Sequence, residues 1–514
     1  MLKSRTQKAA LNTLTASLSE VVTMICGLIL PRLILSNFGS AYNGITSSAT
    51  QFLNAISILT VGVAGTTRVA LYRSLADGDM KKSSSIVRAT EIYMRKVGMV
   101  LLVYILILAA VYPFCIKTEY PWLDVSILVV AAGIGTFGQY FFGTAYTAFL
   151  SANQCVYIYN IFLIISIILN TLISAVLIWL GCSIQIVKLG GAFVFFLRPV
   201  LQNIYVTKKF KIDKHCEPDN SAMKLRKDVM AHSIANIVHD NTDIIVLTVF
   251  CNVQIVSVYT VYNLIMNALK KTQQVFTNGT EALFGNMWAK GEIDKIKKSL
   301  GSYEYIMGLL VSVIFATCYI VILPFVSHYT KGVYDVQYVL PVYALVITTA
   351  QAWFCIRSPY LTLVQGAGHY KQTKTGAYLE AAINLISSTI LVQVIGIVGV
   401  AVGTLIANMF RTLQYAFYIE KNIVHRGIDK FVNKIVWSFS NAIIAYFIVT
   451  PVVNKYAYIS WINWIICSVF SVIVCTCVTF LSSLIFFRQD MRDISRIARN
   501  VVARKTKSKE KGRR

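Results

Sequence analysis

The segment "LGGAFVFFLRPVLQNIYVTKK" (residues 189–209) is mainly apolar, carries one arginine near its centre and ends on two lysines. It matches a second segment, "VGTLIANMFRTLQYAFYIEKN" (402–422), in which Arg411 stands 213 residues after its counterpart Arg198. Each segment has about the 20 mainly apolar residues that a bilayer-spanning helix needs. The pair indicates a membrane protein that contains an internal repeat.

The composition of the whole chain supports this interpretation. The 514 residues are 56% hydrophobic and only 14% charged, with a mean hydropathy of +0.62, which is too apolar for an ordinary soluble domain. We therefore expect an all-α polytopic membrane protein with about fourteen transmembrane helices. The apolar runs lie at 12–35, 43–65, 96–116, 125–149, 157–180, 184–206, 229–251, 254–277, 303–326, 339–363, 375–395, 398–419, 435–454 and 461–487.

The positive charges test this count independently. If both termini are cytosolic, the cytosolic segments collect 38 of the 48 Lys and Arg residues, and the outer loops hold only Lys117, Lys331 and Lys455. The positive-inside rule predicts such an asymmetry, so the formal net charge of +25 mainly reflects topology. The basic tail "RKTKSKEKGRR" (504–514) then favours an anchor to lipid headgroups over a nucleic-acid partner.

Further matches extend the repeat. "LNTLIS" (169–174) recurs as "INLISS" (383–388), and "ADGD" (76–79) recurs as "AKGE" (289–292). Six helices followed by six keep both halves in the same orientation, and two such lobes with a site between them are typical of alternating-access transporters. The expected domains are an N-lobe (1–207), a basic cytosolic linker (208–228), a C-lobe (229–421), a pair of helices numbered 13 and 14 (422–487) and a basic cytosolic tail (488–514).

Motifs for catalysis are missing from the sequence. It contains no P-loop, no glycine-rich dinucleotide fingerprint and no HExxH, and its eleven cysteines include no CxxC pair. We expect no metal site, no cofactor and no enzymatic activity. A membrane glycosyltransferase or polymerase would need a sizeable loop with catalytic carboxylates, whereas the longest loops here, 66–95 and 207–228, are short and basic.

Several segments in helices 1 to 12 resemble the Wzx-type polysaccharide flippases of the multidrug/oligosaccharidyl-lipid/polysaccharide exporter superfamily. They are "LPRLILSNFGSAYNGI" (30–45), "AGTTRVALYRSLADGD" (64–79), "NTDIIVLTVFCNVQIVSVYTVYN" (241–263), "LVQGAGHYKQTKTGAYLEAAIN" (363–384) and "GIVGVAVGTLIANMFR" (396–411).

This resemblance implies a flippase in the bacterial cytoplasmic membrane. Its substrate would be an oligosaccharide on undecaprenyl diphosphate, moved from the cytoplasmic to the outer leaflet for capsule, O-antigen, exopolysaccharide or teichoic-acid-like polysaccharides. Polysaccharide polymerases or glycosyltransferases are the candidate protein partners. Fourteen helices also fit the similar lipid II flippases, so that substrate stays open.

Seven basic residues fall within or at the ends of the predicted helices. If they face the lobe interface, they form a cationic vestibule in which guanidinium groups bind a diphosphate bidentately. The alternative for each is snorkelling to lipid headgroups, and Arg32, near the outer end of helix 1, fits an exit site or an interfacial anchor equally well. The seven are Arg32, Arg68, Arg198, Lys270, Lys271, Arg357 and Arg411.

An acidic and polar stripe is predicted on helix 7. His232, Asn236, His239 and Asp243 are spaced 4, 3 and 4 residues apart, which places them on one helical face, with Asp240 beside them. A charge at the bilayer centre costs about 2.5–3.5 kcal/mol, so these carboxylates should face a hydrated cavity.

Glu20 of helix 1 lies at a similar depth to this stripe. Together they suggest a site for coupling to H⁺ or Na⁺, or a counter-charge to the arginines, and a structural salt bridge is the alternative. A drug or organic-cation antiporter of the same superfamily could use the stripe directly, although the cavity cations would repel its substrates.

Overall fold

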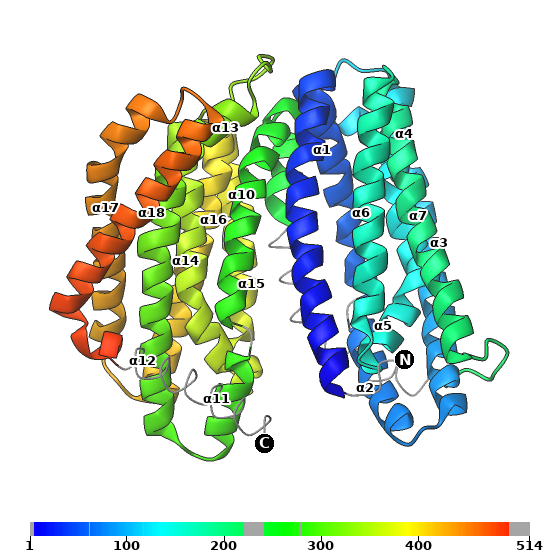
Figure 1. The fold of residues 1–514 in the computed structure, drawn as a ribbon, viewed down its shortest axis with the longest axis horizontal. Helices are drawn as coiled ribbons and strands as arrows, with labels where there is room; N and C mark the ends of the chain where they lie inside the picture. The colour runs from blue at the N-terminus through cyan, green and yellow to red at the C-terminus, as the bar shows by residue number, and fades with distance from the viewer. Residues whose placement is uncertain (1–4, 61, 117, 220–240, 278, 493–514) are drawn as a thin grey trace, which may run out of the picture. The chain divides into compact units, whose positions relative to one another are not determined.

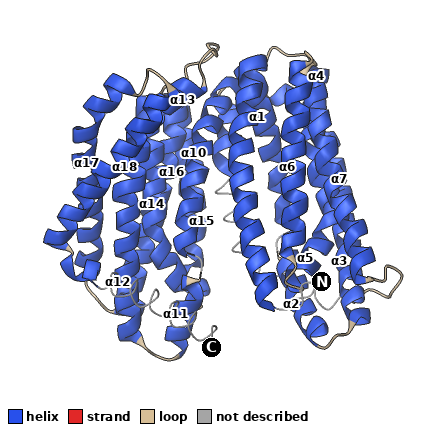
Figure 2. Cartoon of the chain, viewed as in Figure 1, coloured by secondary structure: helices blue, strands red, loops and turns tan. Residues whose placement is uncertain are grey.

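The computed structural model describes residues 5–60, 62–116, 118–219, 241–277 and 279–492, which are helices and connecting loops without a β-strand (Figure 2). Ten helices within these ranges are long and apolar enough to cross a membrane. The expected all-α polytopic fold is therefore confirmed.

The named helices follow the order of the predicted apolar runs (Figure 1). Besides a short helix at Asn241–Phe250, they are α1 (Arg5–Ala55), η1 (Ile56–Thr60), α2 (Val63–Ala76), α3 (Met80–Cys115), α4 (Trp122–Gly138), η2 (Gln139–Gly143), α5 (Thr144–Ala152), α6 (Val156–Trp179), α7 (Ile184–Phe210), α10 (Val253–Thr277), α11 (Thr280–Ala289), α12 (Ile293–Leu310), η3 (Val311–Phe315), α13 (Ala316–Tyr329), α14 (Pro341–Gly366), α15 (Tyr370–Ile395), α16 (Ile397–Ile419), η4 (Glu420–Val424), α17 (Asp429–Tyr456) and α18 (Trp461–Phe486).

The helix boundaries confirm the internal repeat. A shift of 213 residues carries α3 onto the run from α12 through η3 to α13, and carries the start of α7 onto the start of α16. Gly78 follows α2 with φ 72°, and its counterpart Gly291 follows α11 with φ 68°. Both glycines lie in the left-handed region that favours glycine after a helix end. The two halves thus share local backbone geometry as well as hydrophobicity.

The first two predicted helices are joined without a loop, in α1. A continuous helix of 51 residues would extend about 77 Å, far more than one bilayer crossing. Gly39 interrupts it with φ 83° and ψ 179°. The Asp335 carboxylate then accepts hydrogen bonds from the Ser40 backbone N–H at 2.7 Å and from the Ser40 hydroxyl at 2.5 Å. A kink at Gly39, with the Asp335 carboxylate bound to Ser40, therefore takes the place of the loop expected between the first two helices.

The chain packs into two compact units. Unit 1 contains residues 1–264 and 332–337, and unit 2 contains 265–331 and 338–514. In unit 1, α1 packs along α6, and α4 packs along α7. In unit 2, α16 packs against both α14 and α15. The domain boundaries expected from the sequence remain a prediction.

The last two helices of unit 2 form the appended pair that the sequence predicts. α17 and α18 pack against each other and against α13 through a cluster of buried apolar residues that includes Val449 and Cys475. The Trp464 indole N–H donates to the backbone oxygen of Val321 at 3.0 Å. This bond gives the indole N–H a hydrogen-bond partner, while the rest of the ring packs among apolar side chains.

Candidate functional site

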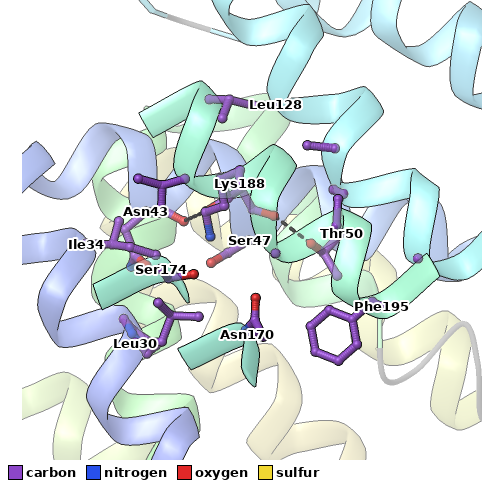
Figure 3. Close-up of a pocket in the computed structure, with 18 of the residues that line it drawn as sticks. Leu30, Ile34, Asn43, Ser47, Thr50, Leu128, Asn170, Ser174, Lys188 and Phe195 are labelled. Carbon is purple, nitrogen blue, oxygen red and sulfur yellow. Dashed lines mark hydrogen bonds between the residues drawn. The ribbon is translucent and has the colours of Figure 1, made fainter. Parts of the chain in front are cut away.

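A cavity of about 620 Å³ lies in unit 1, with its main walls formed by α1, α4, α6 and α7 (Figure 3). Apolar residues such as Ile34 and Phe195 line much of it, and polar and basic side chains are set among them. Its volume is within the range of pockets that bind small ligands. Lys188 and Arg198 of α7 provide positive charge, and the described lining residues include no carboxylate. The uncharged polar lining includes Asn43, Ser47, Thr50, Gln51, Gln139, Asn170 and Ser174. The cavity therefore suits an anionic ligand that also carries hydrogen-bonding and apolar groups.

Lys188 projects among the labelled residues Asn43, Ser47 and Ser174 in the close-up of the cavity (Figure 3). No described residue forms an ion pair with its ammonium group. Lys188 is half-buried. A partly desolvated charge without a counter-charge is costly, so an anion that enters the cavity would reduce this cost. Lys188 is thus the most direct candidate for ligand binding in unit 1.

Arg198 lies ten residues after Lys188, which corresponds to about 15 Å along α7. One terminal N–H of its guanidinium donates to Gln139 Oε1 at 2.7 Å, and the group lies 5.7 Å from the centre of the Tyr159 ring. Its buried Nε has no hydrogen-bond partner among the described residues. The guanidinium is therefore held in place and retains a donor for an anion.

A second group of cations lies inside unit 2, and we call it the Glu380 cluster. The Glu380 carboxylate pairs with Arg357 Nη1 and, at 3.4 Å, with Arg411 Nε. Lys270 Nζ lies 5.4 Å from the centre of the Phe354 ring, and the Arg357 guanidinium lies 4.4 Å from the same ring. Two guanidinium groups thus share one carboxylate, and the Lys270 ammonium beside the same aromatic ring adds to the positive charge of the cluster.

Arg411 is the most deeply buried member of the Glu380 cluster, with 3% of its surface exposed. Its guanidinium donates to the Thr373 backbone oxygen at 3.0 Å, to Gln414 Oε1 at 2.5 Å and to the Tyr415 hydroxyl at 2.6 Å. These bonds occupy its donors inside the protein, so it does not snorkel to lipid headgroups.

The other predicted cations lie apart from these two groups. Arg68 is exposed on α2 and lies at 3.5 Å from the Ser151 hydroxyl, Lys271 is exposed on α10, and Arg32 is half-buried in α1. A vestibule that combines all seven cations from both units remains a prediction.

Most of the predicted helix 7 stripe, namely His232, Asn236, His239 and Asp240, lies outside the described residues. Asp243 is described and is 7% exposed, and its carboxylate accepts a hydrogen bond from the Tyr259 hydroxyl at 3.3 Å. Glu20 is exposed on α1. Burial of Asp243 agrees with a constrained carboxylate, but coupling to an ion remains a prediction.

Sequence reasoning did not single out Lys188 or Glu380, both of which lie within helices. Both are charged residues inside apolar runs, the same signal that marked Arg198 and Arg357. Lys188 lies near the start of its predicted helix, where a contact with lipid headgroups would also explain a lysine. The partners of Glu380 depend on helix packing, which a linear pattern does not show.

Comparisons with solved structures identify this architecture. The fold is that of the MOP-superfamily transporters. A structure described as "Lipid II flippase MurJ, inward closed conformation" matches with a TM-score of 0.67 at 14% identity, covering 92% of this chain and 98% of that one. An inward-facing multidrug resistance MATE family transporter of the MOP superfamily matches with a TM-score of 0.62 at 13% identity, covering 79% of this chain and 95% of that one.

A third match is a MOP superfamily transporter from Pyrococcus furiosus whose binding pocket is described as having reverse polarity, with a TM-score of 0.51 and 13% identity. It covers 80% of this chain and 97% of that one. Neither protein-family models nor characterised protein sequences gave a match to the chain. The structural similarity therefore establishes the MOP fold, and the substrate must be inferred from the side chains.

Proposed function

We propose that the chain flips an undecaprenyl-diphosphate-linked oligosaccharide from the cytoplasmic to the outer leaflet by alternating access, for polysaccharide biosynthesis. The observation that carries this proposal is the unit 1 cavity, where Lys188 and Arg198 meet no carboxylate among the described lining residues. Such a cavity favours an anion. The structural similarity to a lipid II flippase supports a lipid-linked substrate.

The lining of the cavity supports the two chemical parts of this substrate. A diphosphate must leave water to cross the membrane, and charge-assisted hydrogen bonds from Lys188 and Arg198 would replace its hydration. Side-chain amides and hydroxyls, such as those of Asn43, Gln139 and Asn170, can exchange hydrogen bonds with sugar hydroxyls. Lipid II shares the diphosphate carrier, so it remains an alternative that differs only in its glycan.

A drug or organic-cation antiporter is the second candidate, because multidrug MATE transporters share the fold. Its substrates would meet Lys188 and Arg198 as like charges, which disfavours binding. The buried Asp243 is the feature that favours this candidate, since a carboxylate can bind a cation or a proton. A glycosyltransferase or polymerase has less support, because no described group of carboxylates lines the cavity.

The experiment is a flipping assay in proteoliposomes with a fluorescent undecaprenyl-diphosphate glycan. Lys188→Gln and Arg198→Gln should each weaken substrate binding about 10- to 100-fold, because a hydrogen bond to a charged group contributes about 1.5–3 kcal/mol. Lys371→Gln removes the same charge from an exposed position on α15 and should bind normally.

Transport of a cationic dye by the wild-type protein, with no flipping of the lipid, would favour the antiporter instead. Normal affinity for the glycan lipid in both cavity variants, at normal abundance, would contradict the proposal.

A further inference from the structure

A second cavity, of about 430 Å³, lies in unit 2 where α12 and α17 begin and α18 ends. Asp490 is the one carboxylate among its described lining residues. The cations that line it come from α12, α17 and the loop before α17, and they are Lys297, Lys298, Arg426, Lys430 and Lys434. We call this the basic pocket.

The inner wall of the basic pocket is fixed by two buried glutamates behind it. Arg426 Nε donates to both oxygens of Glu420, at 2.8 and 2.9 Å, and its Nη2 pairs with Glu304. The Glu304 side chain is 4% exposed and also accepts from the Tyr360 hydroxyl at 2.5 Å and from Lys434 Nζ at 3.2 Å. This network holds the two cations in place before any ligand arrives, which lowers the entropic cost of binding.

The glutamates and Asp490 do not neutralise the basic pocket. Five cations face these three carboxylates, and a fourth carboxylate, the exposed Asp294, contacts Lys297. Arg426 lies outside the membrane-spanning helices; burial acts to lower its pKa, but Glu304 and Glu420 outweigh burial and raise it. It therefore keeps its charge at every physiological pH.

Three lysines, Lys297, Lys298 and Lys430, form the outer part of the basic pocket and are more exposed than Arg426 and Lys434. The Lys297 ammonium lies 3.8 Å from Asp294, whose side chain is 99% exposed, so this pair is worth little. Lys430 is exposed at the first turn of α17. The pocket therefore combines a rigid inner wall with lysines that can close on an anion.

The surroundings of the basic pocket suggest that it lies at the membrane surface. Phe486 lines it and is 71% exposed, and the neighbouring Ile485 and Val436 are 74% and 57% exposed. Apolar side chains with such exposure, on helices long enough to cross a bilayer, are suited to contact lipid chains. Basic pockets between transmembrane helices are known sites for anionic headgroups.

We propose that the basic pocket binds an anionic phosphate group, carried by a membrane lipid headgroup or present as free phosphate. Lys297, Lys298 and Lys430 would contact the phosphate oxygens, while Arg426 and Lys434 supply the fixed positive wall. This site is separate from the unit 1 cavity and does not depend on the proposed transport function.

The test compares two triple variants of the full chain, purified in a neutral detergent. Lys297→Gln/Lys298→Gln/Lys430→Gln removes the outer lysines and leaves the buried network intact. The control removes the same charge from exposed positions on α15 and at the start of η4, with the substitutions Lys371→Gln/Lys374→Gln/Lys421→Gln. Dissociation constants are measured for dihexanoyl phosphatidylglycerol, dihexanoyl phosphatidylcholine and inorganic phosphate.

We expect the wild-type and control proteins to bind phosphatidylglycerol at least about tenfold more tightly than the pocket variant, since charge-assisted contacts are lost. Selective binding of phosphatidylglycerol assigns the site to lipid headgroups, and equally tight binding of inorganic phosphate assigns it to the free ion. Equal affinity of all three proteins for phosphatidylglycerol, or equal binding of phosphatidylglycerol and phosphatidylcholine by the wild type, would overturn the proposal.

Discussion

Replacing Glu380 by Gln should destabilise unit 2 by about 3–5 kcal/mol, the usual cost of removing one partner from a buried ion pair. Glu380 is 9% exposed, and its carboxylate lies between the guanidinium groups of Arg357 and Arg411. Gln preserves the size of the side chain but removes the negative charge. Arg411 keeps its other hydrogen bonds, so the loss falls mainly on Arg357, whose other contact is the face of Phe354.

This reasoning also predicts the behaviour of a double variant. Arg357→Met in the Glu380→Gln background removes the cation that was left without its partner, so the double variant should recover about 1–3 kcal/mol of the lost stability. The measurement is urea-induced unfolding in mixed micelles, followed by tryptophan fluorescence. The surface variant Glu292→Gln serves as a control, because its exposed pair with Lys295 should contribute little to the free energy of unfolding.

The assignment of a structural role to Glu380 fails under either of two results. One is a Glu380→Gln protein as stable as the wild type. The other is a double variant whose destabilisation equals the sum of the two single changes, which would show that the two side chains do not interact.

Three further predictions concern topology, coupling and the backbone. On a cysteine-free background, cysteines introduced near residues 215 and 505 should resist membrane-impermeant reagents in sealed cells, and labelling there would refute cytosolic placement. Asp243→Asn should abolish the dependence of flipping on a proton or sodium gradient while binding persists; a stable variant with unchanged rate and gradient dependence would exclude this role. Gly39→Ala should lower the free energy of unfolding by about 1–3 kcal/mol, because a φ of 83° is strained for a residue with a side chain and the added Cβ would lie 3.1 Å from Asp335. An unchanged free energy of unfolding would contradict this reasoning.

The fold was predictable from sequence because its signals are periodic or cumulative. Apolar length, the asymmetry of the basic loops and the 213-residue repeat each average over many residues, so single errors do not change the result. The kink in α1, which joins its two helical parts without a loop, was not predictable. It depends on Gly39 and on Asp335, which lies almost 300 positions later in the chain.

The candidate site was less predictable, because the consequence of a buried charge depends on its neighbours across helices. Arg357 and Arg411 were recognised as buried cations, but only packing shows that Glu380 lies between them. Lys188 is the opposite case. It is a candidate for anion binding because the described residues that line its cavity include no carboxylate. Hydropathy indicates that a charged residue is buried. The role of that residue can be inferred only when its partner is also known.

The repeat reveals a difference between the two halves. Arg198 and Arg411 are equivalent, yet Arg411 pairs with the Glu380 carboxylate while Arg198 bonds the neutral Gln139. Helices α6 and α15 begin at residues 156 and 370, so a shift of 214 residues places Ser166 where α15 has Glu380. In the second half, Glu380 therefore neutralises Arg411. In the first half, Arg198 has a neutral partner and its positive charge remains available to an anionic ligand.

This difference leads to a prediction for Ser166→Glu, which would give the first half the acid of the second. Arg411 reaches both Glu380 and the Thr373 backbone oxygen, and the same shift places Tyr159, whose ring Arg198 faces, at the position of Thr373. The new carboxylate should therefore pair with Arg198 and compete with an anionic ligand.

We expect Ser166→Glu to weaken binding of the glycan lipid about as much as Arg198→Gln does, with little further loss when the two changes are combined. Ser166→Gln is the matched control, because it adds similar bulk without charge and should bind more tightly than the Glu variant. If the Gln and Glu variants bind equally, bulk rather than charge explains the loss, and Arg198 does not bind the anion alongside Lys188.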